Sequence, residues 1–169
     1  MSINVFFALL LGLLMAMYAS FAPVASPEQQ TREIPKIELH DFTLYEISQA
    51  GIDHVLEGKE GKKFEERYEI TSAKFSDNTT PLFQSIYAGN ALYQNDVLHL
   101  DTNVLYQRTD GVEFRSSEAK YNTKTAVVTT EGTFVITQSG NRVEGKRLHY
   151  NTEQDAVSAD AVRGSYQLN

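Results

Sequence analysis

The side chains that most often do chemistry in proteins are sparse in this sequence and poorly spaced. There is no cysteine, which excludes a Cys nucleophile, a thiolate metal site, a disulfide framework and a lipid-modified N-terminal Cys. No Ser-His-Asp set, phosphate-binding glycine loop or close carboxylate pair can be assigned. The histidines lack the i, i+2 or i, i+4 spacing typical of metal ligands; they are His40, His54, His99 and His149. We therefore expect a protein that is not an enzyme and that has no cofactor and no metal site.

Three short motifs have simpler structural interpretations. The triplet Tyr-Asn-Thr occurs at 121–123 and at 150–152, and we interpret each as a core tyrosine followed by turn residues. Residues 78–80 (Asn-Thr-Thr) match an N-glycosylation acceptor, but such a short match is commonly accidental. The cluster Lys59–Lys63 mixes both charges and is typical of a solvated turn.

Charge and hydrophobicity are divided very unevenly along the chain. Residues 1–26 carry no charged side chain, and 20 of these 26 residues are apolar. The remaining 143 residues hold all 37 charged side chains and 50 apolar ones, which is about 26% and 35%. The net charge of −7 argues against nucleic acid as a partner, because proteins that bind it need a basic surface.

The N-terminal segment has the length and composition of a membrane anchor. Its apolar stretch from Ile3 to Ala22 would span roughly 30 Å as a helix, the thickness of a bilayer core. A cleaved signal peptide stays open as an alternative, although no Lys or Arg precedes the stretch and Pro23 and Pro27 lie at the small-residue cleavage sites. Under both interpretations the rest of the chain crosses a membrane. We expect an anchor at 1–26, a linker at 27–36 and one domain at 37–169.

The domain has the pattern of an all-β protein. Short runs rich in β-branched and aromatic residues recur every 8–14 residues and are separated by turn residues. The expected strands are Ile37–Ile47, Val97–Leu100, Val104–Tyr106, Val112–Phe114, Val127–Val128, Phe134–Ile136 and Val162–Tyr166, with a turn at 101–103. Phe64–Ala73 is a weak helical candidate for which a strand is equally plausible, and region 55–90 is hard to assign. All-β is the predicted fold class.

An internal repeat and its phase favour a particular all-β architecture. A shift of 29 residues aligns Gly111 with Gly140 and the two Tyr-Asn-Thr triplets with each other. Within each unit the apolar positions change parity, near Ser116-Ser117 and again near Gly145-Lys146. A strand changes its inward face only through a bulge or bend, and bent strands pass between two sheets. We infer an open, two-sheet, jellyroll-like fold.

The parity of the strands also defines the inward-facing set. These residues are Leu98, Leu100, Val104, Tyr106, Val112, Phe114, Tyr121, Val127, Phe134, Ile136, Val143, Leu148, Tyr150 and Val157. One hypothesis is a packed core and nothing more. The other is that the sheets separate along one side and the apolar lining accepts a lipid chain, since each buried methylene contributes about 0.8 kcal/mol. Periodicity does not distinguish the two.

Four segments carry a resemblance to a known family. They are Ile37–Tyr45, Tyr106–Phe114, Ala119–Asn122 and Val143–Tyr150. Together with an N-terminal anchor that has no cysteine, they resemble the LptC family, the inner-membrane-anchored periplasmic component of lipopolysaccharide export in Gram-negative bacteria. The similarity covers nearly the whole chain. The resemblance implies an open β-jellyroll with one transmembrane helix, whose apolar interior holds the acyl chains of lipopolysaccharide.

The resemblance also implies partners that add strands to the edges of the sheet. The N-terminal edge would meet an inner-membrane ABC transporter, and the C-terminal edge a soluble periplasmic bridge protein of the same fold. The edge residues implied are Ile37, Leu39, Phe42, Leu44, Val162, Tyr166 and Leu168. Two alternatives stay open: a tethered structural domain with a closed core, and a secreted protein of the bridge type.

Overall fold

The computed structural model describes residues 33–167, so the predicted anchor lies outside the described residues. Every regular element in the described part is a β-strand, which confirms the all-β prediction. Within residues 33–167 no helix has the length and apolarity needed to cross a bilayer. The strands are β1 (Ile37–Ser48), β2 (Gly51–Lys63), β3 (Arg67–Asp77), β4 (Gln84–Gln94), β5 (Val97–Arg108), β6 (Glu113–Asn122), β7 (Val127–Thr129), β8 (Thr133–Gln138), β9 (Asn141–Asn151) and β10 (Ala156–Ser165).

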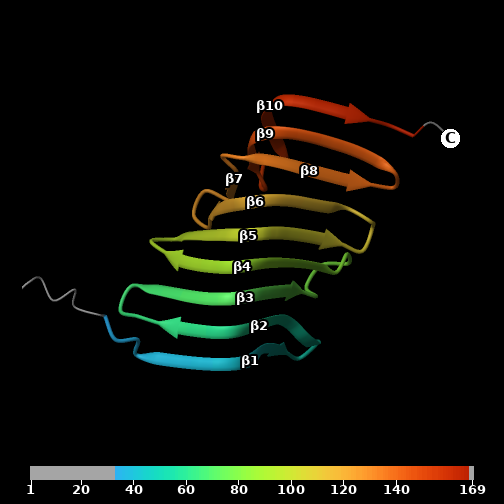
Figure 1. Cartoon of the computed structure of the whole chain (residues 1–169). Helices are drawn as coiled ribbons and strands as arrows, with labels where there is room; N and C mark the ends of the chain where they lie inside the picture. The colour runs from blue at the N-terminus through green and yellow to red at the C-terminus, as the bar shows by residue number, and fades with distance from the viewer. Residues whose placement is uncertain (1–32, 168–169) are drawn as a thin grey trace, which may run out of the picture. The chain divides into compact units, whose positions relative to one another are not determined.

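The strands form one antiparallel sheet in which chain neighbours are mostly sheet neighbours. The order is β1-β2-β3-β4-β5-β6-β7-β9-β10, and β8 also pairs with β6 and β9. β7 and β8 therefore act as one strand interrupted at 130–132, between β6 and β9 (Figure 1). The two sheets predicted from sequence are joined by hydrogen bonds into one, because the long strands continue through their bends. β1 and β10 are the two ends of the described sheet.

Several predicted strands were fragments of longer ones. The segments 97–100 and 104–106 belong to β5, and residues 101–103 are a bend inside that strand, not a turn. Thr102 and Asn103 both have φ of +63° there. The region 55–90, unassigned from sequence, lies in β2, β3 and β4 and the loops between them. β10 begins at Ala156, six residues earlier than predicted, and ends at Ser165.

The helical interpretation of 64–73 is wrong. Phe64 is buried in the turn between β2 and β3, with the guanidinium of Arg67 3.9 Å from the centre of its ring. Ile70 pairs with Gly61 on one side and with Ala91 on the other, so the segment is a strand in the middle of three. Cross-strand pairing of β-branched residues outweighs the weak i, i+4 spacing that favoured a helix.

The parity change predicted from sequence is present. In β6 the buried residues Ser116 and Ala119 lie three apart, and in β9 the buried Gly145 and Leu148 do the same. Positive φ values mark equivalent bends at Asp41, Ser72 and Arg147. Each long strand thus presents the same face of the sheet to the interior on both sides of its bend, although the parity of its inward residues changes there. The described core joins residues from both sides; it comprises Ala73, Ala88, Ala91, Leu100, Val104 and Ala119, with Ile70, Ile86, Leu98 and Phe114 packed against it.

The 29-residue repeat has a structural cause in its turns. The Oδ1 atom of Asn122 accepts hydrogen bonds from the backbone N–H groups of Lys124 and Thr125. Asn151 accepts the equivalent two bonds in the next turn. The threonine that follows each asparagine donates its hydroxyl to a carbonyl of the preceding turn, at 3.1 Å and 3.0 Å. The triplets are turn motifs, as predicted.

Replacing Asn151 with Ala is expected to lower the free energy of unfolding by about 1 kcal/mol, because two backbone donors lose their acceptor. Urea unfolding of the full chain measures the loss. Gln154→Ala in the same turn is the control and should stay within about 0.5 kcal/mol, since its side chain is exposed. Equal losses in both variants would contradict this account of the turn.

Candidate functional site

Directly opposed residues in neighbouring strands share a face of the sheet, so the pairing register defines rows of side chains across it. One row crosses nine strands near the Tyr-Asn turns, and we call it the tyrosine row. Its members are Ile37, Lys63, Tyr68, Tyr93, Leu98, Tyr121, Val128, Tyr150 and Val157. The rings of Tyr68 and Tyr93 lie 6.3 Å apart, and the amine of Lys63 lies 5.2 Å from the centre of the Tyr68 ring. The row is apolar apart from its hydroxyls and Lys63.

A second row lies on the other side of the bends and also crosses nine strands. This phenylalanine row comprises Leu44, Leu56, Phe75, Ile86, Tyr106, Phe114, Ile136, Val143 and Gly164. Phe114 also stacks on Phe134 at 6.2 Å. At the β1 end the row is open to solvent, since Leu44 is 49% and Phe75 39% exposed. The face that is buried in β5, β6 and β8 thus continues toward β1, where Leu44 and Phe75 are exposed and Leu56 between them is half-buried.

Small residues separate the two rows where the strands bend. Phe42 covers Gly58 and Gly61, and a Cβ at either glycine would lie 2.7 or 2.8 Å from its ring. Phe134 covers Gly145 in the same way, at 2.9 Å. Glycine is needed here because the ring occupies the space of a side chain. The rings of Phe42 and Phe134 thus pack against glycines and fill the space at the bend. This packing explains how a domain with modest apolar content still forms a core.

A third row, which is polar, closes the inward face beyond the phenylalanine row. It begins with Glu46, His54, Asp77, Gln84 and Arg108 on successive strands. The Nδ1 atom of His54 lies 2.8 Å from Oε2 of Glu46, and the amide of Gln84 donates to Asp77 at 2.8 Å. The hydroxyl of Tyr106 donates to Gln84 at 2.8 Å, and burial raises the pKa of that hydroxyl. The inward face is therefore apolar over two rows and hydrogen-bonded at one end.

Asp77 is the most enclosed acid of this polar row, with 14% of its side chain exposed. A hydrogen bond from Thr79, supported by one from Gln84, lowers the pKa of its carboxyl. Because the folded-state pKa is depressed, the stabilisation is present above the unfolded pKa and is lost as pH falls through the folded value. We expect the stability difference between the wild type and Asp77→Asn to be constant from pH 7 to 5 and to shrink below about pH 4.

Carboxyl-carbon NMR titration of Asp77, together with urea unfolding across this pH range, measures the effect. Thr79→Ala is the matched control and should raise the Asp77 pKa, because it removes the hydroxyl that donates at 2.6 Å. A carboxyl that titrates at its ordinary value in the wild type would contradict the prediction.

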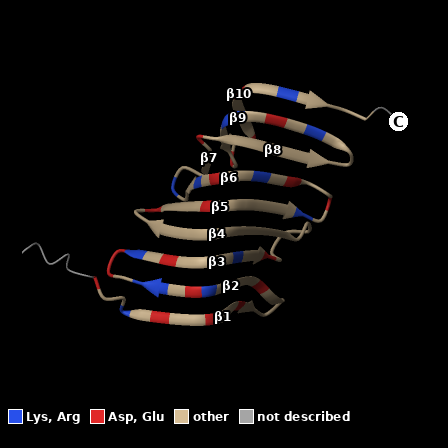
Figure 2. Ribbon diagram, in the orientation of Figure 1, with Lys and Arg blue, Asp and Glu red and all other residues tan. Residues whose placement is uncertain are grey.

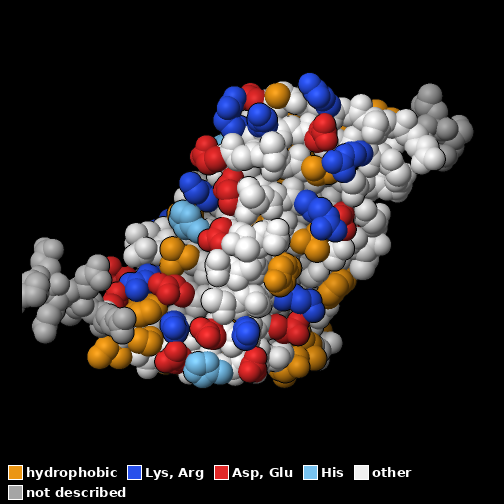
Figure 3. Space-filling view, in the orientation of Figure 1, with side chains coloured by type: hydrophobic (Ala, Val, Ile, Leu, Met, Phe, Trp, Pro, Cys, Tyr) orange, Lys and Arg blue, Asp and Glu red, His pale blue; other side chains and the backbone are white. Residues whose placement is uncertain are grey.

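The outward face is polar and charged where the inward face is apolar. Glu57 of β2 pairs with Lys74 of β3 at 2.8 Å, and Lys62 lies 3.5 Å from Glu38. In the ribbon of Figure 2, β2 and β3 carry both basic and acidic residues, and β1 carries acidic ones. In the space-filling view, the same strands show charged groups across the centre and apolar groups toward the ends (Figure 3). The contrast between the faces makes the inward face the candidate site.

The structure brings most of the predicted inward residues together. Eleven of them lie on the inward face in the two rows or between them: Leu98, Leu100, Val104, Tyr106, Phe114, Tyr121, Phe134, Ile136, Val143, Leu148 and Tyr150. Val112 lies just before β6, where its carbonyl accepts from Arg108 at 2.9 Å. Sequence reasoning missed Leu56, Phe75 and Ile86, because β2–β4 were not recognised as strands.

One predicted inward position is wrong, and another is on the inward face but exposed. Val127 is opposed to Asn122 and Asn151, which places it on the outward face, whereas Val128 is opposed to Tyr121 and Tyr150. The valine pair was assigned with the wrong parity because β7 has only three residues. Val157 belongs to the tyrosine row but is 65% exposed, since β10 is the last strand of the sheet that residues 33–167 form.

Most of the residues implied as partner contacts lie at the two ends of the sheet. Ile37, Leu39, Phe42 and Leu44 are in β1, and Val162 is in β10. Tyr166 follows β10 and is 69% exposed, and Leu168 lies outside the described residues. β1 is paired with β2 over eleven positions, while the pairing of β10 with β9 is interrupted twice.

A long antiparallel sheet, bent along its length, with an apolar inward face and two unpaired ends, is a jellyroll-like architecture. The same fold occurs in LptH from Pseudomonas aeruginosa, described as the LptA-homologous periplasmic component of the lipopolysaccharide transport device. The two share 13% sequence identity with a TM-score of 0.51, over 81% of this chain and 98% of LptH.

The family model "Lipopolysaccharide-assembly, LptC-related" matches residues 6–167, and the chain belongs to this LptC family. This confirms the resemblance seen in the sequence. No curated protein matches the chain.

Proposed function

We propose that this protein is a non-enzymatic component of lipopolysaccharide export that holds the lipid on its inward face. The family and the fold support a role in lipopolysaccharide transport. The observation that carries the specific proposal is the phenylalanine row, which is continuous across nine strands and is exposed at Leu44 of β1 and Phe75 of β3, with Leu56 half-buried between them. Acyl chains that cover it would bury apolar surface that water now contacts, at about 25 cal/mol per Å².

In this proposal the domain receives lipopolysaccharide from an inner-membrane ABC transporter and passes it to a soluble periplasmic bridge protein. The chain would be anchored in the inner membrane by 1–26 with its domain in the periplasm, as expected for the family. Unpaired strands present free N–H and C=O groups to which a partner strand can add. β1 would face the transporter and β10 the bridge protein; the pairing of β1 with β2 has one register shift and that of β10 with β9 has two.

Photocrosslinking tests the inward face directly. Crosslinking residues at Tyr106 of β5 and Phe114 of β6 should capture lipopolysaccharide in cells. The matched controls are Gln107 and Arg115, which follow them in the same strands, are opposed to outward neighbours and are exposed. Equal capture from both faces would overturn the proposal.

Purification from membranes and N-terminal sequencing distinguish the proposed function from its two alternatives. Recovery of an ABC transporter together with lipopolysaccharide, from membranes and without added crosslinker, is the result expected of a transport component. A tethered scaffold with a closed core predicts a dry interior and no lipid. A secreted bridge-type protein predicts mature material that begins near Ser26 on N-terminal sequencing.

A further inference from the structure

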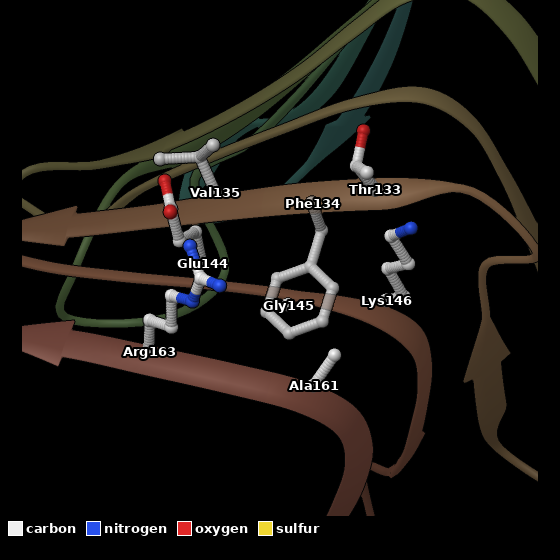
Figure 4. A pocket seen from close by; sticks show the side chains of 8 residues that line it. All are labelled: Thr133, Phe134, Val135, Glu144, Gly145, Lys146, Ala161 and Arg163. Carbon is white, nitrogen blue, oxygen red and sulfur yellow. The ribbon is translucent and has the colours of Figure 1, made fainter.

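A hollow lies between β8, β9 and β10, where the pairing of the last two strands is interrupted. Ala156–Ser158 pair with β9, as do Arg163–Ser165, but between them only Asp160 pairs, with Lys146. Ala161, in the gap, has φ of +49°. The hollow has a volume of about 500 Å³, within the range of small-molecule sites. It is lined by Thr133, Phe134, Val135, Glu144, Gly145, Lys146, Ala161 and Arg163 (Figure 4).

Phe134 and Ala161 belong to the apolar part of the lining, and Phe134 connects it with the inward face. Phe134 is 3% exposed and also stacks on Phe114 of the phenylalanine row. Its ring lies against β9 because Gly145 has no side chain, and a Cβ there would also meet the carbonyl of Asp160 at 3.1 Å. Figure 4 shows the ring of Phe134 between β8 and the Ala161 side chain. Because Phe134 is almost wholly buried, the hollow at the interrupted seam ends at its ring.

The rim of the hollow is cationic. β9 and β10 carry four basic side chains, and two of them are neutralised: Arg142 lies 3.4 Å from Glu144, and Arg147 pairs with Asp160. The other two, Lys146 and Arg163, line the hollow and have no ion-pair partner among residues 33–167. The only acid of the lining, Glu144, is already engaged by Arg142. This small region thus presents unpaired positive charge on a protein of net charge −7.

We propose that this hollow binds the anionic end of an amphiphile: Lys146 and Arg163 hold its anionic group, and Phe134 and Ala161 contact the start of its chain. This second proposal depends on the proposed function in one respect, which is that the ligand is an amphiphile. It assigns a polar-headed amphiphile to the β9–β10 seam, whereas the phenylalanine row contacts only apolar chains. Lys146 and Arg163 are both exposed, so salt screens each of them, and binding of the anionic group depends on the two cations acting together with the apolar contact.

The test uses the full chain in a nonionic detergent, with dodecyl phosphate as the probe and dodecyl maltoside as the uncharged amphiphile of equal chain length. Amide NMR shifts of Gly145 and Ala161 report on the seam. We expect dodecyl phosphate to shift both signals saturably and Lys146→Ala/Arg163→Ala to weaken its binding at least tenfold. The matched control is Lys59→Ala/Lys120→Ala, which removes two cations of β2 and β6 that also have no acidic partner in the described part of the chain.

Equal binding of dodecyl phosphate and dodecyl maltoside would overturn the proposal, and so would equal losses of binding in the two double variants. Competition by millimolar inorganic phosphate would overturn it as well, because the site would then recognise the anion alone. Inorganic phosphate that neither shifts the signals nor competes supports an amphiphile. Crosslinking of lipopolysaccharide at Tyr106 and Phe114 does not require the seam, so the two proposals fail separately.

Discussion

Replacing Phe75 with Asp is expected to lower lipopolysaccharide binding by at least about tenfold while the domain stays folded. Phe75 stands in the phenylalanine row where the row is open to solvent, 39% exposed. Full burial of a phenylalanine side chain contributes about 1.5–3 kcal/mol, so covering the exposed 39% contributes about 0.6–1.2 kcal/mol, and each 1.4 kcal/mol is a factor of ten in affinity. A carboxylate there would also have to lose its water against methylenes, which adds to the loss.

The matched control is Tyr87→Asp. Tyr87 lies in the neighbouring strand β4, is also 39% exposed, and is opposed to Lys74 and Leu105 on the outward face. Lipopolysaccharide retained per molecule of purified protein is the measurement, with circular dichroism to verify the fold. The control should retain wild-type binding. Similar losses in Phe75→Asp and Tyr87→Asp would mean that binding does not distinguish the faces.

A charge at Val104 is expected to prevent folding altogether. Val104 is 1% exposed, the least exposed large side chain in the described core, and it lies in β5 directly after the bend. A buried carboxylate without a partner costs several kcal/mol, which is comparable to the whole stability of a domain of this size. We expect Val104→Asp to show no cooperative urea transition in the full chain.

Val157→Asp is the control for this second prediction. It makes the same substitution at a valine that is 65% exposed, in the terminal strand β10. Its free energy of unfolding should stay within about 1 kcal/mol of the wild type. A cooperative transition for Val104→Asp near the wild-type midpoint would show that the core joining the two sides of the bends is not what stabilises the sheet.

The C-terminal half of the domain could be predicted well because its local patterns agree with its pairing. Gly111 and Gly140 both have positive φ, and the asparagines at 122 and 151 cap equivalent turns. A parity change that is read from sequence requires a bulge or a bend in the strand. Here turn chemistry and alternation suffice to place the strands and their inward face.

The strands of the N-terminal half of the domain could not be assigned from the sequence, and the reason is physical. β2 holds three glycines and several charges, so it has little alternation of its own. Two of those glycines are covered by the Phe42 ring from β1, which supplies the apolar group that β2 lacks. A strand whose inward surface comes from its neighbour carries no hydrophobic signal in its own sequence.

The sequence by itself determined the fold class, the family and the bends, because composition, turn residues and parity are local properties of the chain. The tertiary structure decided which residues are opposed across strands. Only pairing joins Leu44, Phe75 and Phe114 into one row and leaves the β1 end of that row exposed. Only the interrupted β9–β10 register creates a hollow with Lys146 and Arg163 at its rim. Register depends on long-range contacts, and a shift of one residue would reverse every face.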